Sequence, residues 1–192
     1  MKKVENNNFY TYGMIKPDGL CHAKEIIDMI LEAGLEVQYI EYDFLTDEII
    51  FENYSHCYGK DFYPGMKKHL QSDLVIKMLI YDKTGNAVSN YRKVLGATRS
   101  WEADENTIRG RFGDKKIGYK NVAHGSGNEK EANEEIIRFF KNNISLMLNE
   151  LKIYNEKEAL NKVISYIDDS YAKETIEDRL NRAKKIYLNG TK

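Results

Sequence analysis

The chain has 192 residues, of which 42% are hydrophobic and 31% charged, and its formal net charge at pH 7 is −1. This length and composition predict a globular domain of ordinary size, alone or with an appendage, and exclude an intrinsically disordered chain. The balanced charge gives no electrostatic reason to expect nucleic acid or a membrane surface as the main partner, and no apolar run reaches the roughly 18 residues that a membrane helix needs.

In chain order, alternating apolar residues predict strands and helical spacing predicts helices, with capping residues at helix starts and glycines at helix ends. The expected elements are a strand at 9–15, a helix at 23–33, a strand at 35–44, a helix at 46–56, a short helix ending at Leu70, a strand at 73–81, a helix at 86–95, a short turn at 107–111, a strand at 121–124 and a helix at 129–148.

This order contains two β-α-β units whose helices are expected on one face of the sheet. It predicts a ferredoxin-like α+β sandwich with a four-stranded antiparallel sheet. The segment 145–192 has helical spacing and no strand pattern, so we expect a helical C-terminal extension. The predicted organisation is therefore a tail at 1–8, a domain at 9–144 and the extension at 145–192.

The N-terminal segment and the two cysteines indicate a reducing compartment. Residues 1–8 lack the apolar core of a signal peptide, which favours a cytoplasmic protein. Cys21 and Cys57 form no CxxC pair, which favours free thiols over a disulfide or a metal site.

A histidine in the sequence Asn-Val-Ala-His-Gly-Ser at 121–126 is the candidate reactive residue. With an unperturbed pKa near 6.5, His124 would be largely neutral at pH 7 and could act as a nucleophile or proton carrier. Three carboxylates on the following predicted helix could hold its ring from behind. They are Glu131, Glu134 and Glu135.

Cationic residues at the ends of other predicted elements suggest a polyphosphate ligand. Lys16, Arg92 and Arg109 would supply positive charge, and Thr98 a hydroxyl donor. Guanidinium groups bind phosphate oxygens with two parallel hydrogen bonds, and phosphoryl transfer depends mainly on positioning and charge neutralisation.

Three segments together resemble the nucleoside diphosphate kinase family: IKPDG at 15–19, TIRG at 107–110 and NVAHGS at 121–126. The resemblance runs from about residue 9 to 140. It implies an enzyme that moves the γ-phosphate of a nucleoside triphosphate such as ATP to a nucleoside diphosphate by a ping-pong mechanism, through phosphohistidine at His124.

The resemblance also implies roles for other positions. Lys16 and Asn121 would bind the ribose hydroxyls and lie close to the transferred group, while Arg92, Thr98 and Arg109 would hold the phosphates. The remaining roles are stacking of the base on Phe62 beside Met66, and positioning of the reacting groups by Tyr54, Ser126 and Glu135. Among these, Tyr54 would lie beside the histidine, Ser126 would position the transferred phosphate, and Glu135 would accept a hydrogen bond from the ring.

Mg²⁺ bound through the nucleotide phosphates is the implied cofactor, with no dedicated protein cage. A homo-oligomer is also implied, but the segment 96–106, which supports subunit contacts in the family, lacks the usual proline here, so its size stays open. An alternative function is a nucleotide-binding regulatory or interaction module that has lost turnover. The other histidines, His22, His56 and His69, are expected to be surface or turn residues.

Overall fold

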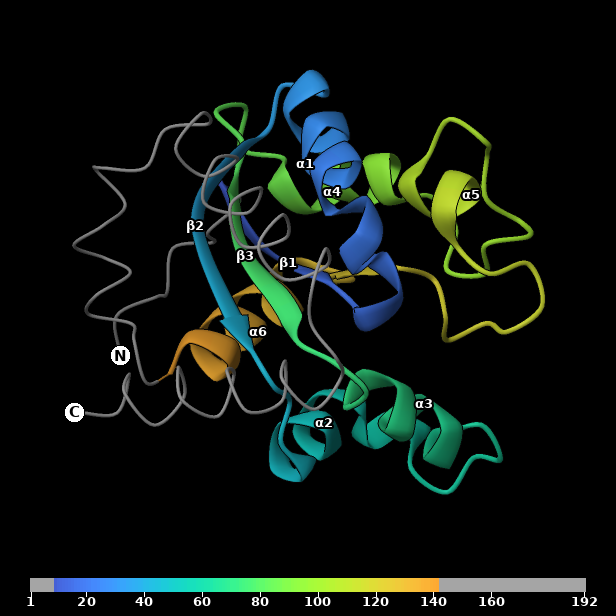
Figure 1. Ribbon diagram of the computed structural model, residues 1–192. Helices are drawn as coiled ribbons and strands as arrows, with labels where there is room; N and C mark the ends of the chain where they lie inside the picture. Colours follow the sequence, from blue (N-terminus) through green and yellow to red (C-terminus); the bar gives the residue numbers. More distant parts are fainter. Residues whose placement is uncertain (1–8, 142–192) are drawn as a thin grey trace, which may run out of the picture.

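The computed structural model describes residues 9–141, and a four-stranded sheet forms its centre (Figure 1). Every strand pair is antiparallel, and the strand order is β2-β3-β1-β4. The strands are β1 (Tyr10–Ile15), β2 (Glu36–Asp43), β3 (Val75–Tyr81) and β4 (Ala123–Gly125). This topology confirms the predicted ferredoxin-like α+β fold.

One face of the sheet is covered by α1 (Ala23–Glu32) and α4 (Ala87–Leu95), which lie next to each other in Figure 1. Both helices bury apolar stripes, and alternate residues of the strands point toward them, as the two-residue period of a strand requires. This core layer includes Ile26, Ile30, Ile76, Ile80 and Tyr91.

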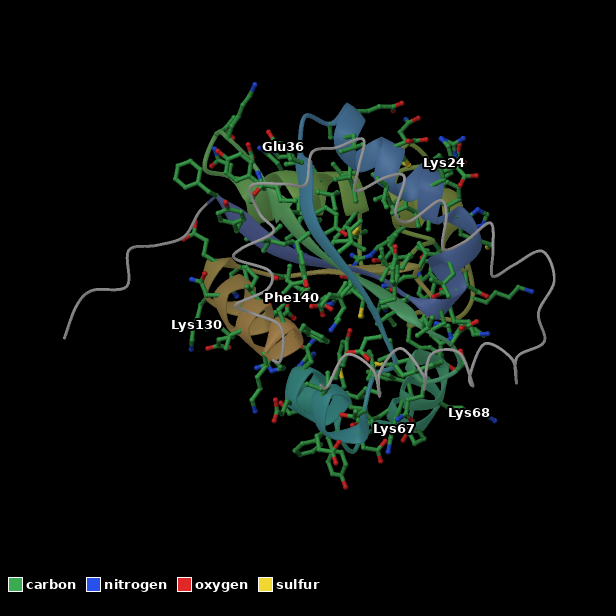
Figure 2. All side chains as sticks on the ribbon, turned by 60° about the vertical axis from the view of Figure 1, so that its left-hand side comes forward. Lys24, Glu36, Lys67, Lys68, Lys130 and Phe140 are labelled. Carbon is green, nitrogen blue, oxygen red and sulfur yellow. The ribbon has the colours of Figure 1, made fainter. Side chains whose placement is uncertain are left out.

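The opposite face carries a second helical layer made of α2 (Asp47–Tyr54), α3 (Tyr63–Leu70) and α6 (Glu129–Phe140). Its core contains Tyr12, Met14, Ile50, Leu79 and Phe140. In Figure 2 the labelled lysines on α1, α3 and α6 lie at the periphery, whereas Phe140 lies toward the interior. The sequence predicted helices on one face of the sheet only. That prediction holds for α1 and α4, but the structure adds a second helical layer on the opposite face.

Short elements complete the described chain: the 3₁₀ helices η1 (Pro17–His22) and η2 (Ser55–Cys57), and the five-residue helix α5 (Ile108–Phe112). The predicted cap Thr46 accepts a hydrogen bond from the third backbone N–H of α2, and Thr107 does the same for α5. Among residues 9–141, no helix is long and apolar enough to cross a membrane.

Two expectations extend beyond the described residues. The helix expected at 129–148 corresponds to α6, which ends at Phe140, and its predicted continuation lies outside residues 9–141. The expected tail at 1–8 and helical extension at 145–192 lie outside them as well.

Candidate functional site

A cavity of about 1040 Å³ opens beside β4, between α3, α6 and the loops that flank α5. Its size suits a ligand as large as a nucleotide. Ten of the eleven predicted site residues line it, and Ser126 is the exception. The ten are Lys16, Tyr54, Phe62, Met66, Arg92, Thr98, Arg109, Asn121, His124 and Glu135.

The ring of His124 is tied to α6. Its Nε2 lies 2.8 Å from Oε1 of Glu135. Burial would raise the pKa of the Glu135 carboxyl, but the charge and hydrogen bond of His124, together with Ser126, hold it below its usual value. An ionised carboxylate can only accept, so Nε2 carries the ring proton and donates it. In the neutral imidazole the lone pair is then on Nδ1, the atom suited to nucleophilic attack.

The second oxygen of Glu135 is occupied by Ser126. The Ser126 hydroxyl, 1% exposed, donates to Oε2 of Glu135 over 2.6 Å. Because a hydroxyl has one proton, Ser126 in this geometry has none to donate to a phosphate oxygen. Ser126 thus lies behind Glu135, and its expected role at the transferred phosphate stays a prediction.

Two tyrosines flank the histidine ring. Tyr54 lies edge-on, with ring centroids 5.8 Å apart, and Tyr12 lies at 6.0 Å. Tyr54 is thus beside His124, where the resemblance put it, whereas nothing in the sequence singled out Tyr12. Their packing limits the orientations that the imidazole can adopt.

Two buried cations lie on the same wall of the cavity. Nζ of Lys16 donates to Oδ1 of Asn121 over 2.6 Å and to the carbonyl of Tyr119 over 3.2 Å. The guanidinium of Arg109 donates through Nε and Nη2 to the carbonyl of Ala123, at 3.2 and 3.0 Å. Neither side chain forms a salt bridge within residues 9–141.

With no salt bridge to Lys16 or Arg109 in the described part of the chain, burial is the largest influence on the pKa of both groups, and the charge of Asp18 offsets it only in part at Lys16. Burial, followed by repulsion from Arg109, lowers the pKa of Lys16 from 10.5 to about 8. Burial is also the main reason that the pKa of Arg109 falls from 12.5 to about 10. A bound anion would offset both penalties, so this wall is suited to phosphate.

Asn121 joins the lysine to the loop that carries Thr98. Its Oδ1 accepts from Lys16, and its Nδ2 donates to the carbonyl of Thr98 over 2.7 Å. The Thr98 side chain and Arg92, in the last turn of α4, remain exposed at the cavity lining. The predicted phosphate-binding residues are thus brought together, and Asn121 has a structural connection that the resemblance did not imply.

The start of α3 supplies an apolar wall. Phe62, at the N-cap position, is 43% exposed, and Met66 is buried one turn further along. An aromatic ring held at a cavity mouth offers a face for stacking a planar ligand. The structure therefore brings both predicted base-binding residues to one side of the cavity.

A strained turn precedes the histidine. Val122 has a φ of 56°, a conformation that a β-branched residue rarely adopts, and N–H of Ala123 bonds to the carbonyl of Asn121 over 2.6 Å. The turn is held from outside: Oδ2 of Asp18 accepts from N–H of Val122 over 3.0 Å, and N–H of Lys16 donates to the Val122 carbonyl over 2.8 Å.

Asp18 belongs to the IKPDG segment, and the resemblance implied no separate role for it. Its Oδ1 lies 2.9 Å from Nε2 of His69 on α3. The expectation that His69 is a surface or turn residue is wrong, because its side chain is 9% exposed and lies against Tyr119. No local pattern marks a histidine whose partner is 51 residues away.

The fold and cavity define a class of protein: a ferredoxin-like α+β domain with a cationic pocket around a histidine–glutamate pair. The comparisons give the family. The nucleoside diphosphate kinase family model matches residues 10–144, and the chain belongs to that family.

Relatives and solved structures agree with this assignment. A nucleoside diphosphate kinase of Streptococcus pneumoniae is 32% identical over 137 residues, which are 68% of this chain and 98% of that protein. Human thioredoxin domain-containing protein 3 is 34% identical over 135 residues, which are 68% of this chain but only 22% of that protein.

Two crystal structures have similar folds. The nucleoside diphosphate kinase of Encephalitozoon cuniculi, without ligand, is 31% identical with a TM-score of 0.63, and the match covers 68% of this chain and 88% of that one. A halophilic nucleoside diphosphate kinase of Halobacterium salinarum, in complex with CDP, is 28% identical with a TM-score of 0.62, covering 68% and 86%.

Proposed function

We propose that this chain is an active nucleoside diphosphate kinase that carries the phosphoryl group on His124. The observation that supports this most is a pair of buried cations, Lys16 and Arg109, that form no salt bridge among residues 9–141 and line the same cavity as His124, whose Nδ1 is available. Positive charge beside a positioned nucleophile is what phosphoryl transfer requires.

In the first half-reaction, Nδ1 of His124 attacks the γ-phosphorus of a nucleoside triphosphate. The N–P bond forms as the bond from the γ-phosphorus to the β–γ bridging oxygen breaks, and the bonding electrons leave with the nucleoside diphosphate. Glu135 stabilises the positive charge that develops on the ring, through the Nε2 proton. In the second half-reaction, a β-phosphate oxygen of another nucleoside diphosphate attacks the phosphorus. The N–P bond breaks, and its electron pair returns to Nδ1.

In this proposal Arg92, Thr98 and Arg109 bind the phosphates. Lys16, with Asn121 at the ribose, lies close enough to the transferred group for its ammonium to contact the phosphate and, with the two arginines, to neutralise charge as the group moves. The base stacks on Phe62, which is exposed at the start of α3. Stacking without hydrogen bonds to base edges would accept any base, which suits an enzyme that acts on several nucleotides.

Mg²⁺ would accompany the nucleotide as part of the substrate. Within residues 9–141 no group of three or more His, Cys, Asp or Glu side chains could hold a metal ion, so phosphate oxygens would be its main ligands. The cationic wall fits this arrangement, because lysine and arginine would bind phosphate oxygens and leave others free for the ion. When bound, the ion supplies charge neutralisation.

A coupled assay tests the proposal. The wild-type chain, with ATP and Mg²⁺, should convert an added nucleoside diphosphate to its triphosphate, with parallel double-reciprocal plots because the substrates bind in turn. Nucleotide binding by calorimetry without any transfer would instead select the regulatory or interaction module.

A homo-oligomer in the cytoplasm completes the proposal. In the described sheet, β2 is an edge strand, and Phe51 and Trp101 are exposed, so surface remains for subunit contacts. Light scattering of the purified chain measures the assembly, and a single-chain mass would contradict it.

A further inference from the structure

His69 is a mostly enclosed histidine that the proposed reaction leaves without a role. It lies in the last turn of α3, and its Nε2 lies 2.9 Å from Oδ1 of Asp18 in η1. The side chains are 9% and 17% exposed, so water competes little for this contact. A hydrogen bond between two poorly exposed groups on separate elements fixes how those elements meet.

The direction of this hydrogen bond follows from the ionisation of Asp18. Burial would raise the pKa of the Asp18 carboxyl, but the hydrogen bond and charge of His69, with the charge of Lys16 and the N–H of Val122, hold it below its usual value. A carboxylate only accepts, so Nε2 of His69 is the donor. The ring of Tyr119, with its centroid 6.0 Å away, limits where the imidazole can turn.

The second carboxylate oxygen of Asp18 contacts the turn directly before β4. It accepts from N–H of Val122, the residue whose φ of 56° turns the chain two positions before His124. A strained turn persists only where its surroundings hold it. Asp18 can hold the turn at Val122 only while its carboxylate keeps its orientation. His69 fixes that orientation, because it is bonded to Oδ1 while Val122 is bonded to Oδ2.

We propose that His69 is a positioning residue for phosphoryl transfer, acting through Asp18 on the turn at Val122 and so on His124. The inference deepens the proposed function and rests on it for its kinetic consequence. It also links two parts of the pocket, because α3 carries the Phe62–Met66 wall at its start and His69 at its end. Helix α3 therefore both carries the proposed base-binding residues and, through His69 and Asp18, holds the turn that precedes His124.

The kinetic test compares three side chains at one position. His69→Phe keeps an aromatic ring beside Tyr119 and cannot donate to Asp18, whereas His69→Gln keeps an N–H donor. We expect His69→Phe to lower kcat about tenfold with KM little changed, because losing a hydrogen bond to a charged group has an effect of this order. His69→Gln should restore most of the rate. The same two substitutions at His22, which stacks on Phe112 away from the cavity, should leave kcat unchanged.

A second measurement does not depend on activity. Amide hydrogen exchange at Val122 should be about tenfold faster in His69→Phe than in wild type and slow again in His69→Gln, since the carboxylate that protects this N–H loses its orientation. If the wild type has no turnover, the proposed function fails. The exchange pattern would still test whether His69, through Asp18, holds the turn at Val122.

Unchanged exchange and unchanged kcat in His69→Phe would overturn the inference. Equal losses in His69→Phe and His69→Gln would overturn it as well, because only the donor distinguishes them. If His69→Phe does not fold, His69→Leu takes its place, and thermal unfolding of each variant shows that the compared proteins are folded.

Discussion

Lys16 and Arg109 give the pocket its electrostatic character at the scale of single residues. Both are buried, both donate to backbone carbonyl groups, and neither forms a salt bridge among residues 9–141, although the charge of Asp18 acts on Lys16. Uncompensated burial of a cation is unfavourable unless a ligand supplies the opposite charge. Their lowered pKa values of about 8 and about 10 express that imbalance.

A pH dependence follows for Lys16. Its folded-state pKa of about 8 lies below the usual 10.5, so the ammonium that we propose contacts the phosphate is lost as pH rises through about 8. We expect kcat/KM, which reports the free enzyme, to fall above that pH. Lys16→Arg should move this limb upward, since arginine stays charged.

The control for this profile is Lys67→Arg, which replaces a lysine on the outer side of α3 that pairs with Asp47 (Figure 2). It should leave the pH profile unchanged. A wild-type kcat/KM that stays flat from pH 7 to well above 8 would count against Lys16 as the titrating phosphate ligand.

Glu135 and Ser126 form the second residue-scale unit. Glu135→Gln removes the charge behind the Nε2 proton and should lower kcat on the order of 100-fold, within the range for loss of an acid–base partner. Ser126→Ala should cost less, because it removes one hydrogen bond to Glu135.

A double variant with both Glu135→Gln and Ser126→Ala tests whether Ser126 acts through Glu135. The double variant should be little worse than Glu135→Gln alone, because residues in one hydrogen-bond network are not additive. Fully additive losses in kcat would instead return Ser126 to a separate role at the transferred phosphate.

At this scale, the motifs predicted which side chains gather at the cavity but not how each is bonded. The NVAHGS segment indicated His124, and the resemblance, rather than the helical pattern, singled out Glu135 among three carboxylates. The direction of the Ser126 hydroxyl and the contact of His69 with Asp18 depend on backbone geometry and on distant elements, which a local pattern does not contain.

At the scale of elements, η1 and the turn at Val122 form the support for β4. The Pro-Asp-Gly sequence of the IKPDG segment lies in the 3₁₀ helix η1. The sequence placed the fourth strand at 121–124, whereas β4 is Ala123–Gly125, because the positive φ at Val122 interrupts the extended backbone. That turn exists through contacts with residues about a hundred positions away.

Gly19 lies where a side chain would collide with the Val122 backbone, so its substitution tests the support. A Cβ on Gly19 would lie 2.4 Å from the carbonyl oxygen of Val122, which is backbone and cannot swing aside. Gly19→Ala should therefore lower the free energy of unfolding by about 1–3 kcal/mol, the usual cost of overpacking. Urea denaturation measures this change.

Gly118→Ala is the matched control, since its Cβ would meet only Trp101, at ordinary contact distances of 3.5 Å and more. It should be neutral or stabilising by under about 1 kcal/mol. Equal effects of the two substitutions would mean that the approach of η1 to Val122 is not a constraint.

At the scale of the whole molecule, the β-α-β order was sufficient to predict the fold, because alternating strands and amphipathic helices leave few ways to close a four-stranded antiparallel sheet. The burial of both faces was not predicted. The pattern of α6, which supplies Glu135 and Phe140 to the second layer, shows that one face of the helix is buried but not which side of the sheet it covers.

The most direct test of the account is phosphorylation of the protein itself. Incubation with γ-labelled ATP and Mg²⁺ should give one acid-labile, base-stable phosphate per chain, on Nδ1 of His124. Addition of a nucleoside diphosphate should discharge it, and His124→Gln should not be labelled. No label on a folded wild-type chain, or label that persists in His124→Gln, would contradict His124 as the phosphoryl carrier.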